Sequence, residues 1–214
     1  MKTDELINSL STHVPPVNHW RTGRAIVIAI LIGGAAALGA GYLALGTRSD
    51  LGESDARLYL TIKLAFVSVV IVLATTVLTR LARPGGEYRI RKSVVGLPFV
   101  AMLLLALLSL GQAPSAHWEE MIVGQMWLQC LLIIPALAII PFALVTWVVH
   151  RVAAPTDLRL TGAFAGLVAG SMSAMGYALH CTDDALPFIA LWYGGTIGLC
   201  TGIGAVLGPR LLRW

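Results

Sequence analysis

Long runs of apolar residues, separated by short polar segments, recur along the whole chain. The runs comprise residues 25–46, 59–80, 94–111, 122–149, 161–180 and 187–208. Roughly 20 apolar residues are the length that an α-helix needs to cross the hydrocarbon core of a bilayer. The pattern therefore predicts an all-α membrane protein with six transmembrane helices. An even number of crossings places both termini on the same side.

The fourth run is longer than a single crossing needs. Residues 122–149 would extend for about 42 Å as a straight α-helix, against a hydrocarbon core of about 30 Å. Within this run, Trp127 and Trp147 have the spacing of aromatic residues that mark the two membrane interfaces. This placement leaves residues 119–126 along the interface and puts Cys130 about one helical turn inside the bilayer.

The N-terminal segment, residues 1–24, is the only sizeable polar part of the chain, and residues 25–214 form the predicted membrane domain. The segment lacks the apolar stretch of a cleaved signal peptide. Its pattern predicts a short helix with a capping residue at its start and a narrow apolar stripe on one side. The residues concerned are Thr3, Asp4 and Glu5 in the first turn, Leu6, Ile7 and Leu10 in the stripe, and Pro15 and Pro16 at the end. Because so short a helix is marginal in water, the segment is either a frayed tail or a docking helix that becomes ordered on a partner protein.

Composition and charge agree with a membrane protein. The chain is 57% hydrophobic and 12% charged, and a soluble domain carries about 25% charged residues. All but three of the 15 Lys and Arg residues lie in segments on the side of the termini; the exceptions are Arg48, Arg57 and Lys63. Because basic residues are retained on the cytoplasmic side, both termini are predicted to be cytoplasmic. The same distribution accounts for the net charge of +4 without any binding of nucleic acid.

Two of the three cysteines lie on the predicted outer side. Cys130 is near the outer end of the fourth run, and Cys181 directly follows the fifth. In an oxidising compartment the two thiols could form a disulfide, although no C-x-x-C motif is present. They could instead bind a soft or borderline metal ion together with neighbouring imidazole and carboxylate groups. The candidate ligands for such an ion are Cys130, Cys181, His180, Asp183, Asp184 and His117.

The remaining features predict structural roles. Cys200 lies in the middle of the sixth run and is expected to be inert filler. Lys63, near the outer end of the second run, is expected to extend its ammonium group to the surface. Glycines repeat every four residues at 162, 166 and 170 and again at 194, 198 and 202, a spacing that lets helices approach closely in lipid.

Catalysis is not expected from this sequence. No phosphate-binding loop, zinc motif or nucleophile elbow is present. Ser171 and Ser173 have no evident base in the sequence around them. We therefore predict that the protein is not an enzyme and requires no cofactor.

Several short segments together resemble the negative-regulator-of-sigma-F family. They are Met1–Ile7 followed by Pro15-Pro16, Trp127-x-x-Cys130, Tyr177–Cys181, Ala190–Tyr193 and Gly208–Trp214. The resemblance covers essentially the whole chain, and the segment around Cys181 and the C-terminal end are its most specific parts. Members of the family are bacterial inner-membrane anti-sigma factors with six spans.

The resemblance implies a function and assigns residues to it. The N-terminal segment, with Thr3, Asp4, Leu6, Ile7, Leu10, Pro15 and Pro16, would hold an extracytoplasmic-function sigma factor at the bacterial inner membrane. Two cysteines of the family, which match Cys130 and Cys181 here, are implicated in the response to heavy-metal or oxidative stress. The expected partners are this sigma factor and membrane lipid, with no direct contact to nucleic acid. Cys200 matches no motif of the family.

Two other functions would use the same features. A membrane thiol–disulfide oxidoreductase would use Cys130 and Cys181, and the missing C-x-x-C motif counts against it. A small solute transporter would line a path with Lys63, Gln125 and Gln129. The sequence leaves open the inducing signal, a disulfide between the two outer cysteines, and the oligomeric state.

Overall fold

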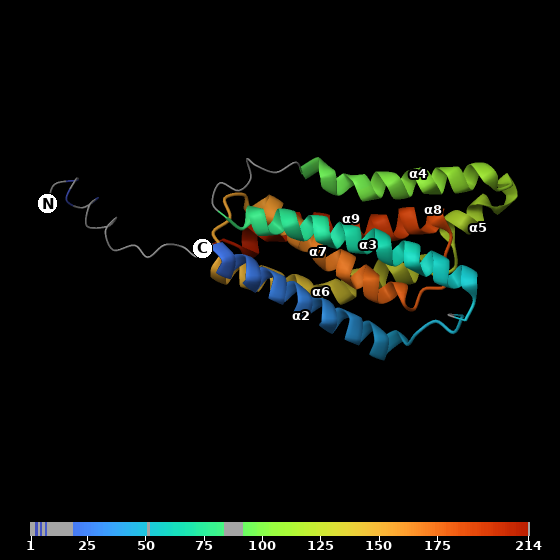
Figure 1. Cartoon of the computed structure of the whole chain (residues 1–214), viewed down its shortest axis with the longest axis horizontal. Helices are drawn as coiled ribbons and strands as arrows, with labels where there is room; N and C mark the ends of the chain where they lie inside the picture. The colour runs from blue at the N-terminus through green and yellow to red at the C-terminus, as the bar shows by residue number, and fades with distance from the viewer. Residues whose placement is uncertain are drawn as a thin grey trace.

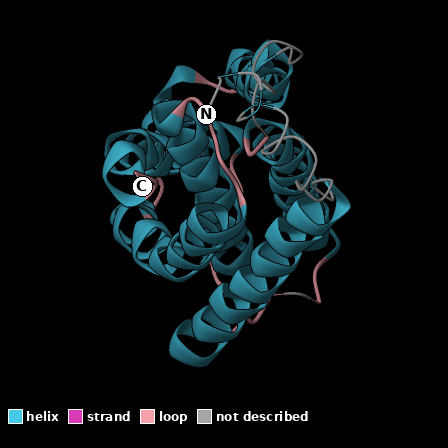
Figure 2. Cartoon of the chain, turned by 90° about the vertical axis from the view of Figure 1, so that its left-hand side faces the viewer, coloured by secondary structure: helices cyan, strands magenta, loops and turns pink. Residues whose placement is uncertain are grey.

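The computed structural model of the chain is a bundle of helices that run along one long axis (Figure 1). The structure describes residues 19–50, 52–83 and 92–213, together with Thr3, Glu5 and Ile7. The long helices are α2 (His19–Leu45), α3 (Ser54–Leu81), α4 (Leu97–Gln112), α6 (Trp127–Val152), α7 (Leu158–Ala178) and α9 (Gly194–Leu211). The short elements are η2 (Lys92–Gly96), η3 (Ser115–His117), α5 (Trp118–Val123), α8 (Leu186–Phe188) and the π-helical η4 (Ile189–Tyr193). All the regular elements among the described residues are helical (Figure 2), which confirms the predicted all-α class.

Five segments are long and apolar enough to cross a membrane. They are 20–45, 54–81, 93–112, 115–152 and 186–211. The sixth predicted crossing corresponds to α7, which is also long enough, at 21 residues, to span about 30 Å. Its glycines and serines lower its hydropathy, and it is not among these five segments. The structure therefore confirms the helices of the predicted runs, with five of them suited to a membrane by length and composition.

The fourth predicted run divides into two helices. The short α5 ends before Gly124, which has a φ of +62°, and α6 begins at Trp127. A positive φ is readily adopted only by glycine, so Gly124 permits the turn between the two helices. Helix α6 therefore starts at Trp127, the residue at which the sequence placed the outer end of the crossing.

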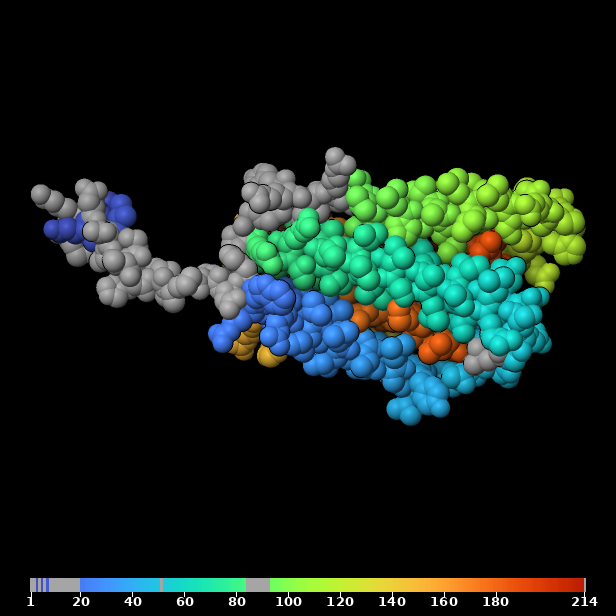
Figure 3. Space-filling view, in the orientation of Figure 1, coloured from blue at the N-terminus to red at the C-terminus, as the bar shows by residue number. Residues whose placement is uncertain are grey.

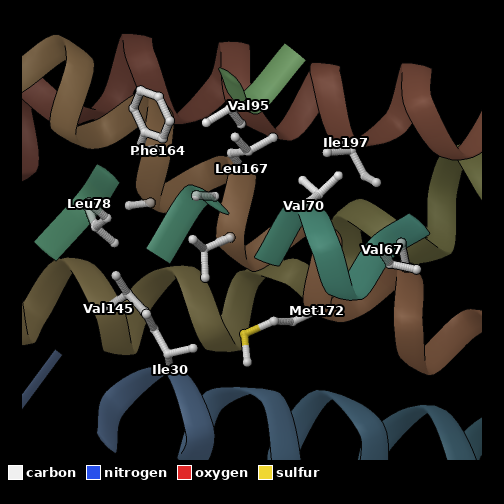
Figure 4. Packing of buried hydrophobic residues seen from close by; sticks show 14 of the residues in the cluster. Ile30, Val67, Val70, Leu78, Val95, Val145, Phe164, Leu167, Met172 and Ile197 are labelled. Atoms are coloured by element: carbon white, nitrogen blue, oxygen red, sulfur yellow. The ribbon is translucent and has the colours of Figure 1, made fainter. Parts of the chain in front are cut away.

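Helix α7 lies at the centre of the bundle, with α2, α3, α6 and α9 packed around it. Figure 3 shows one face, on which α2 and α3 cover most of α7. Apolar side chains from these helices interlock in the interior (Figure 4), among them Ile30 of α2, Val70 of α3, Val145 of α6, Leu167 of α7 and Ile197 of α9. By contrast, α4 lies at the edge and buries only Met102 and Ala106.

The closest helix pair is α7 with α9, and glycines make their approach possible. A Cβ atom added to Gly162 or Gly166 would collide with the backbone at Gly204 or Cys200. The first predicted glycine repeat is thus a packing surface. In the second repeat, Gly198 and Gly202 have nothing within 4 Å of an added Cβ, and on α9 it is Gly204 and Gly208 that face α7.

Replacing Gly166 by Leu is expected to destabilise the bundle, because its side chain would have to force α7 away from α9. Overpacking of this kind costs roughly 1–3 kcal/mol or more. The matched control is Gly198→Leu, which enters open space on α9. Thermal unfolding in detergent would compare them; equal melting temperatures would contradict the glycine contact.

The bundle has two distinct ends. Helix α2 begins and α9 ends at the same end (Figure 1), as an even number of crossings requires. We call the opposite end, where residues 46–50, 113–126 and 179–185 connect the helices, the distal end. Of the predicted N-terminal docking helix, Thr3, Glu5 and Ile7 are helical and exposed. Its other predicted residues, Asp4, Leu6, Leu10, Pro15 and Pro16, lie outside the described part of the chain.

Candidate functional site

The thiols of Cys130 and Cys181 are neighbours at the distal end. Cys130 lies in the first turn of α6, and Cys181 lies in the loop after α7. Both are fully buried and neither is in a disulfide. Both belong to the same buried cluster of side chains, and the Cys130 thiol is close enough to lower the pKa of Cys181. Cys200 belongs to a separate apolar cluster with Ala138 and Ala169, as its expected filler role requires.

Asp183 attaches the loop of Cys181 to the start of α6. Its Oδ2 atom accepts hydrogen bonds from the backbone N–H groups of Gln125 at 2.9 Å and Met126 at 2.7 Å. These are amides that the beginning of a helix leaves without an intrahelical acceptor. A Cβ at Gly124 would lie 2.7 Å from the same carboxylate oxygen, so glycine at this position lets Asp183 approach. Asp183 thus holds the loop that carries Cys181 against the start of α6, the helix that carries Cys130.

Four charged side chains form a network beside the thiols, which we call the distal ionic cluster: Arg48, Asp50, Lys63 and Asp184. The ammonium nitrogen of Lys63 lies 2.6 Å from Asp184, and Arg48 lies 2.6 Å from Asp184 and from Asp50. The cluster joins the loop after α2, helix α3 and the loop after α7.

The two basic residues of the cluster also bind the backbone of Cys181. Lys63 Nζ donates a hydrogen bond to its carbonyl oxygen at 3.1 Å, and Arg48 Nη1 donates another at 3.3 Å. The backbone N–H of Arg48 bonds to the carbonyl of Leu179 at 3.0 Å. The position of Cys181 is thus tied directly to the loop that follows α2.

Lys63 is not at the surface, and the predicted extension of its ammonium group to solvent is wrong. Its side chain is fully buried, paired with Asp184 and 5.8 Å from the centre of the Tyr193 ring. An ion pair inside the bundle offsets the cost of removing the ammonium from water. The sequence contained a signal for this ion pair. A charged residue within an apolar run usually faces a partner, and Asp184 was predicted on the same outer side as Lys63.

Hydrogen bonding sets the protonation of the groups in the distal loops. The guanidinium of Arg48 lowers the pKa of Asp50 below its ordinary value, and Asp50 and Asp184 together raise the pKa of Arg48. A hydrogen bond from the Cys130 thiol lowers the pKa of Cys181, an effect that burial opposes and the Lys63 ammonium reinforces. Cys181 is therefore the member of the pair that more readily becomes a thiolate, the reactive form of cysteine.

Two tyrosines complete the surroundings of the thiols. Tyr177 of α7 and Tyr193 of η4 are fully buried, with ring centres 6.2 Å apart. Both tyrosines belong to the same buried cluster as Cys130 and Cys181, and neither hydroxyl has a hydrogen-bond partner among the described residues. Sequence reasoning missed both tyrosines as site residues, because nothing in their spacing shows that their hydroxyls converge.

The predicted metal ligands do not assemble. In the part of the chain that the structure describes, no three His, Cys, Asp or Glu side chains are placed to hold a metal ion. The carboxylate of Asp183 is occupied by the amides of α6, and that of Asp184 by Arg48 and Lys63. His180 lies beside the ring of Tyr177, and His117 is exposed on η3. The six candidates are thus not gathered at one point among the described residues, and a metal site with Cys130 and Cys181 stays a prediction.

Comparison with known proteins relates the whole chain to one family. The model of the family described as negative regulator of sigma F matches residues 10–214. A "Probable anti-sigma-F factor NrsF" of Azospira oryzae is 32% identical over 214 residues, covering all of both chains. An "Anti-sigma-F factor NrsF" of Caulobacter vibrioides is 29% identical over 218 residues, again covering all of both chains. No solved structure matches this chain.

Proposed function

The chain belongs to the negative-regulator-of-sigma-F family, and we propose that it is an anti-sigma factor that holds an extracytoplasmic-function sigma factor at the bacterial inner membrane. The observation that carries the proposal is the full-length similarity to proteins named as anti-sigma-F factors. The polar N-terminal segment, residues 1–24, is the part that binds the sigma factor. Its apolar stripe of Leu6, Ile7 and Leu10 suits an amphipathic helix that docks in a groove of the partner.

The membrane arrangement in this proposal has six crossings, with α7 as the fifth, and both termini in the cytoplasm. The charge at the two ends supports this orientation. The end of the bundle that carries the termini holds Arg21, Arg24, Arg80, Arg83 and Arg151, whereas the basic residues of the distal end include Arg48 and Lys63, which are paired with acids. Basic residues that remain exposed mark the cytoplasmic side.

The signal acts on the pair of Cys130 and Cys181 from the outer compartment. A hydroperoxide would oxidise the pair by accepting two electrons and two protons, so that an S–S bond forms and the oxidant leaves as alcohol and water. A thiophilic metal ion would act on the same two sulfurs as thiolates, with loss of their protons. The adjacency of the thiols supports both routes, and the lowered pKa of Cys181 makes it the sulfur that reacts first.

Helix α2 connects this site to the N-terminal segment. Helices α2 and α6 pack against each other. At mid-length a Cβ at Gly33 would lie 2.8 Å from the Cα atom of Pro141, and near the termini Thr22 Oγ1 donates to the carbonyl of Val152 at 3.3 Å. A shift of α6 at Cys130 therefore has to be accommodated by α2, which leads directly into the sigma-binding segment. Such a close-packed pair transmits displacements because interiors are not continuously deformable.

Replacing either Cys130 or Cys181 by Ser is expected to abolish release of the sigma factor under stress, because a serine hydroxyl neither forms a disulfide nor binds a soft ion. The matched control is Cys200→Ser, which removes the third buried thiol away from the pair. The measurement is induction of a promoter that depends on the sigma factor, with protein level followed by immunoblot. If both variants are induced normally at a normal protein level, these thiols are not the sensor.

Burial argues against the rival oxidoreductase function. Dithiol exchange with a protein substrate needs a thiolate that the substrate can reach, and both Cys130 and Cys181 are fully buried. Small oxidants and ions are better matched to such a site than another protein. No described feature favours the transporter, since Lys63 is engaged with Asp184 rather than lining a path.

A further inference from the structure

An apolar groove runs along the bundle between α6 and α9, on the half nearer the termini. It has a volume of about 670 Å³. Its floor is formed by Gly166 and Ala169 of α7, whose small side chains leave the space between the two flanking helices open. The walls are formed mainly by Pro135, Ile139, Phe142 and Ala143 of α6 and by Ile203 and Leu207 of α9.

The groove lies in segments that are suited to a membrane. Helix α6 and helix α9 both belong to the stretches long and apolar enough to cross one, and the groove opens outward between them. No Asp, Glu, Lys or Arg lines it. Inside a bilayer the space has to be filled by a hydrocarbon chain or by another apolar helix.

The end of the groove nearest the termini is basic. Trp147, His150 and Leu211 line this end, and the guanidinium of Arg151 lies 5.9 Å from the centre of the Trp147 ring. Arg210 and Arg213, in and just after the last turn of α9, are exposed beside Leu211. An apolar slot with exposed guanidinium groups at its end is complementary to a lipid with a phosphate at the head of its acyl chains.

The same charges disfavour a second copy of the chain as the occupant. A symmetric dimer brings the same surface of each copy together. With its axis along the membrane normal, it would place Arg151 and Arg210 of one copy near those of the other, where like charges repel in the membrane interface. The charge pattern therefore favours an anionic occupant over a protein one.

We propose that this groove binds one anionic glycerophospholipid of the surrounding bilayer, with an acyl chain on the floor of Gly166 and Ala169 and the phosphate against Arg151 and Arg210. The lipid fills the space beside α6 from Pro135 to His150, and so supports the helix that carries Cys130. The inference rests on the membrane location proposed above and is independent of the sigma factor and of the thiols.

The test is native mass spectrometry of the full-length protein released from nanodiscs that contain equal amounts of phosphatidylglycerol and phosphatidylethanolamine. The unmodified chain is expected to retain one phosphatidylglycerol. Ala143→Phe, which fills the groove, and the double variant Arg151→Gln/Arg210→Gln, which removes the phosphate partners, should each lower this retention by about tenfold or more. For the double variant the reason is that each basic residue near an anionic lipid contributes on the order of fivefold, and the two together roughly 25-fold.

Two control variants separate the groove from general effects. Leu132→Phe adds a similar side chain to an exposed position of α6 outside the groove, and Arg57→Gln removes an exposed charge at the distal end; both should retain the lipid. Circular dichroism and melting temperature establish that every variant is folded. Equal retention of the two lipids, full retention by Ala143→Phe, or release of a dimer without lipid would each overturn the proposal.

Discussion

Replacing Asp184 by Ala is expected to destabilise the folded chain by roughly 3–5 kcal/mol, the cost of leaving buried charges without their partner. The carboxylate pairs with Lys63 and Arg48 at 2.6 Å each, and both basic side chains are removed from solvent. Without Asp184, Lys63 would keep only its hydrogen bond to the carbonyl of Cys181, and Arg48 would keep that same acceptor and its pair with Asp50. Denaturant unfolding in mild detergent would measure the loss, together with the steady-state amount of protein in membranes.

Two further variants separate the charge from the packing. The double variant Lys63→Met/Asp184→Leu removes the buried pair together and should recover much of the stability, because an apolar pair of similar volume often replaces a buried ion pair without loss. Asp50→Ala removes the more exposed partner of Arg48 and should have a much smaller effect. Equal stability of Asp184→Ala and the unmodified chain would show that the distal ionic cluster does not hold the bundle together.

The helices of the bundle could be predicted from the sequence because the bilayer imposes a length on every apolar run. The predicted runs overlap α2, α3, α4, α6, α7 and the continuous segment 186–211, and the fourth run begins in the short α5. The central position of α7 in the bundle was harder to predict from the sequence. Only the contact with α9 shows why its glycines and serines are tolerated: small residues let the surrounding helices approach, at the expense of the hydropathy that marks a span.

The thiols were predicted as a pair of outer residues, but their surroundings were not. Cys130 and Cys181 are 51 positions apart, and only the packing of α6 against α7 brings them together. In the sequence, Arg48 and Lys63 are separate features, Arg48 as a basic residue of an outer loop and Lys63 as a side chain expected to extend to the surface. Their common partner Asp184 lies more than 100 residues away, so the ionic cluster depends on the arrangement of three segments that periodicity does not specify.

The glycine repeats and the metal ligands show a different limit. Spacing alone does not say which face of a helix meets its neighbour: on α9 it is Gly204 and Gly208 that face α7, and not Gly198 and Gly202 of the predicted repeat. In the same way, the carboxylates beside Cys181 were grouped by closeness in sequence. In the structure the two carboxylates have different partners. Asp183 accepts hydrogen bonds from backbone amides at the start of α6, and Asp184 pairs with Lys63 and Arg48.

Removing residues 2–18 is expected to abolish inhibition of the sigma factor while leaving α2, which begins at His19, and the rest of the bundle intact. The physical reason is that the deletion takes away the apolar stripe of Leu6, Ile7 and Leu10. A Leu or Ile side chain that becomes buried on binding contributes about 1.5–3 kcal/mol. Changing all three to Ala should therefore weaken the complex by at least about a hundredfold, and the matched control Asn8→Ala/Ser9→Ala, outside the stripe, should not.

The most direct measurement of the central claim is the unstressed output of a promoter that depends on the sigma factor, compared between the full-length chain and the chain lacking residues 2–18. Membrane fractionation establishes that both proteins insert to the same level. The account predicts that the truncated chain gives the output of a strain without any inhibitor, and that the triple Ala variant approaches it. Low output from a fully inserted truncated chain would mean that the N-terminal segment does not hold the sigma factor.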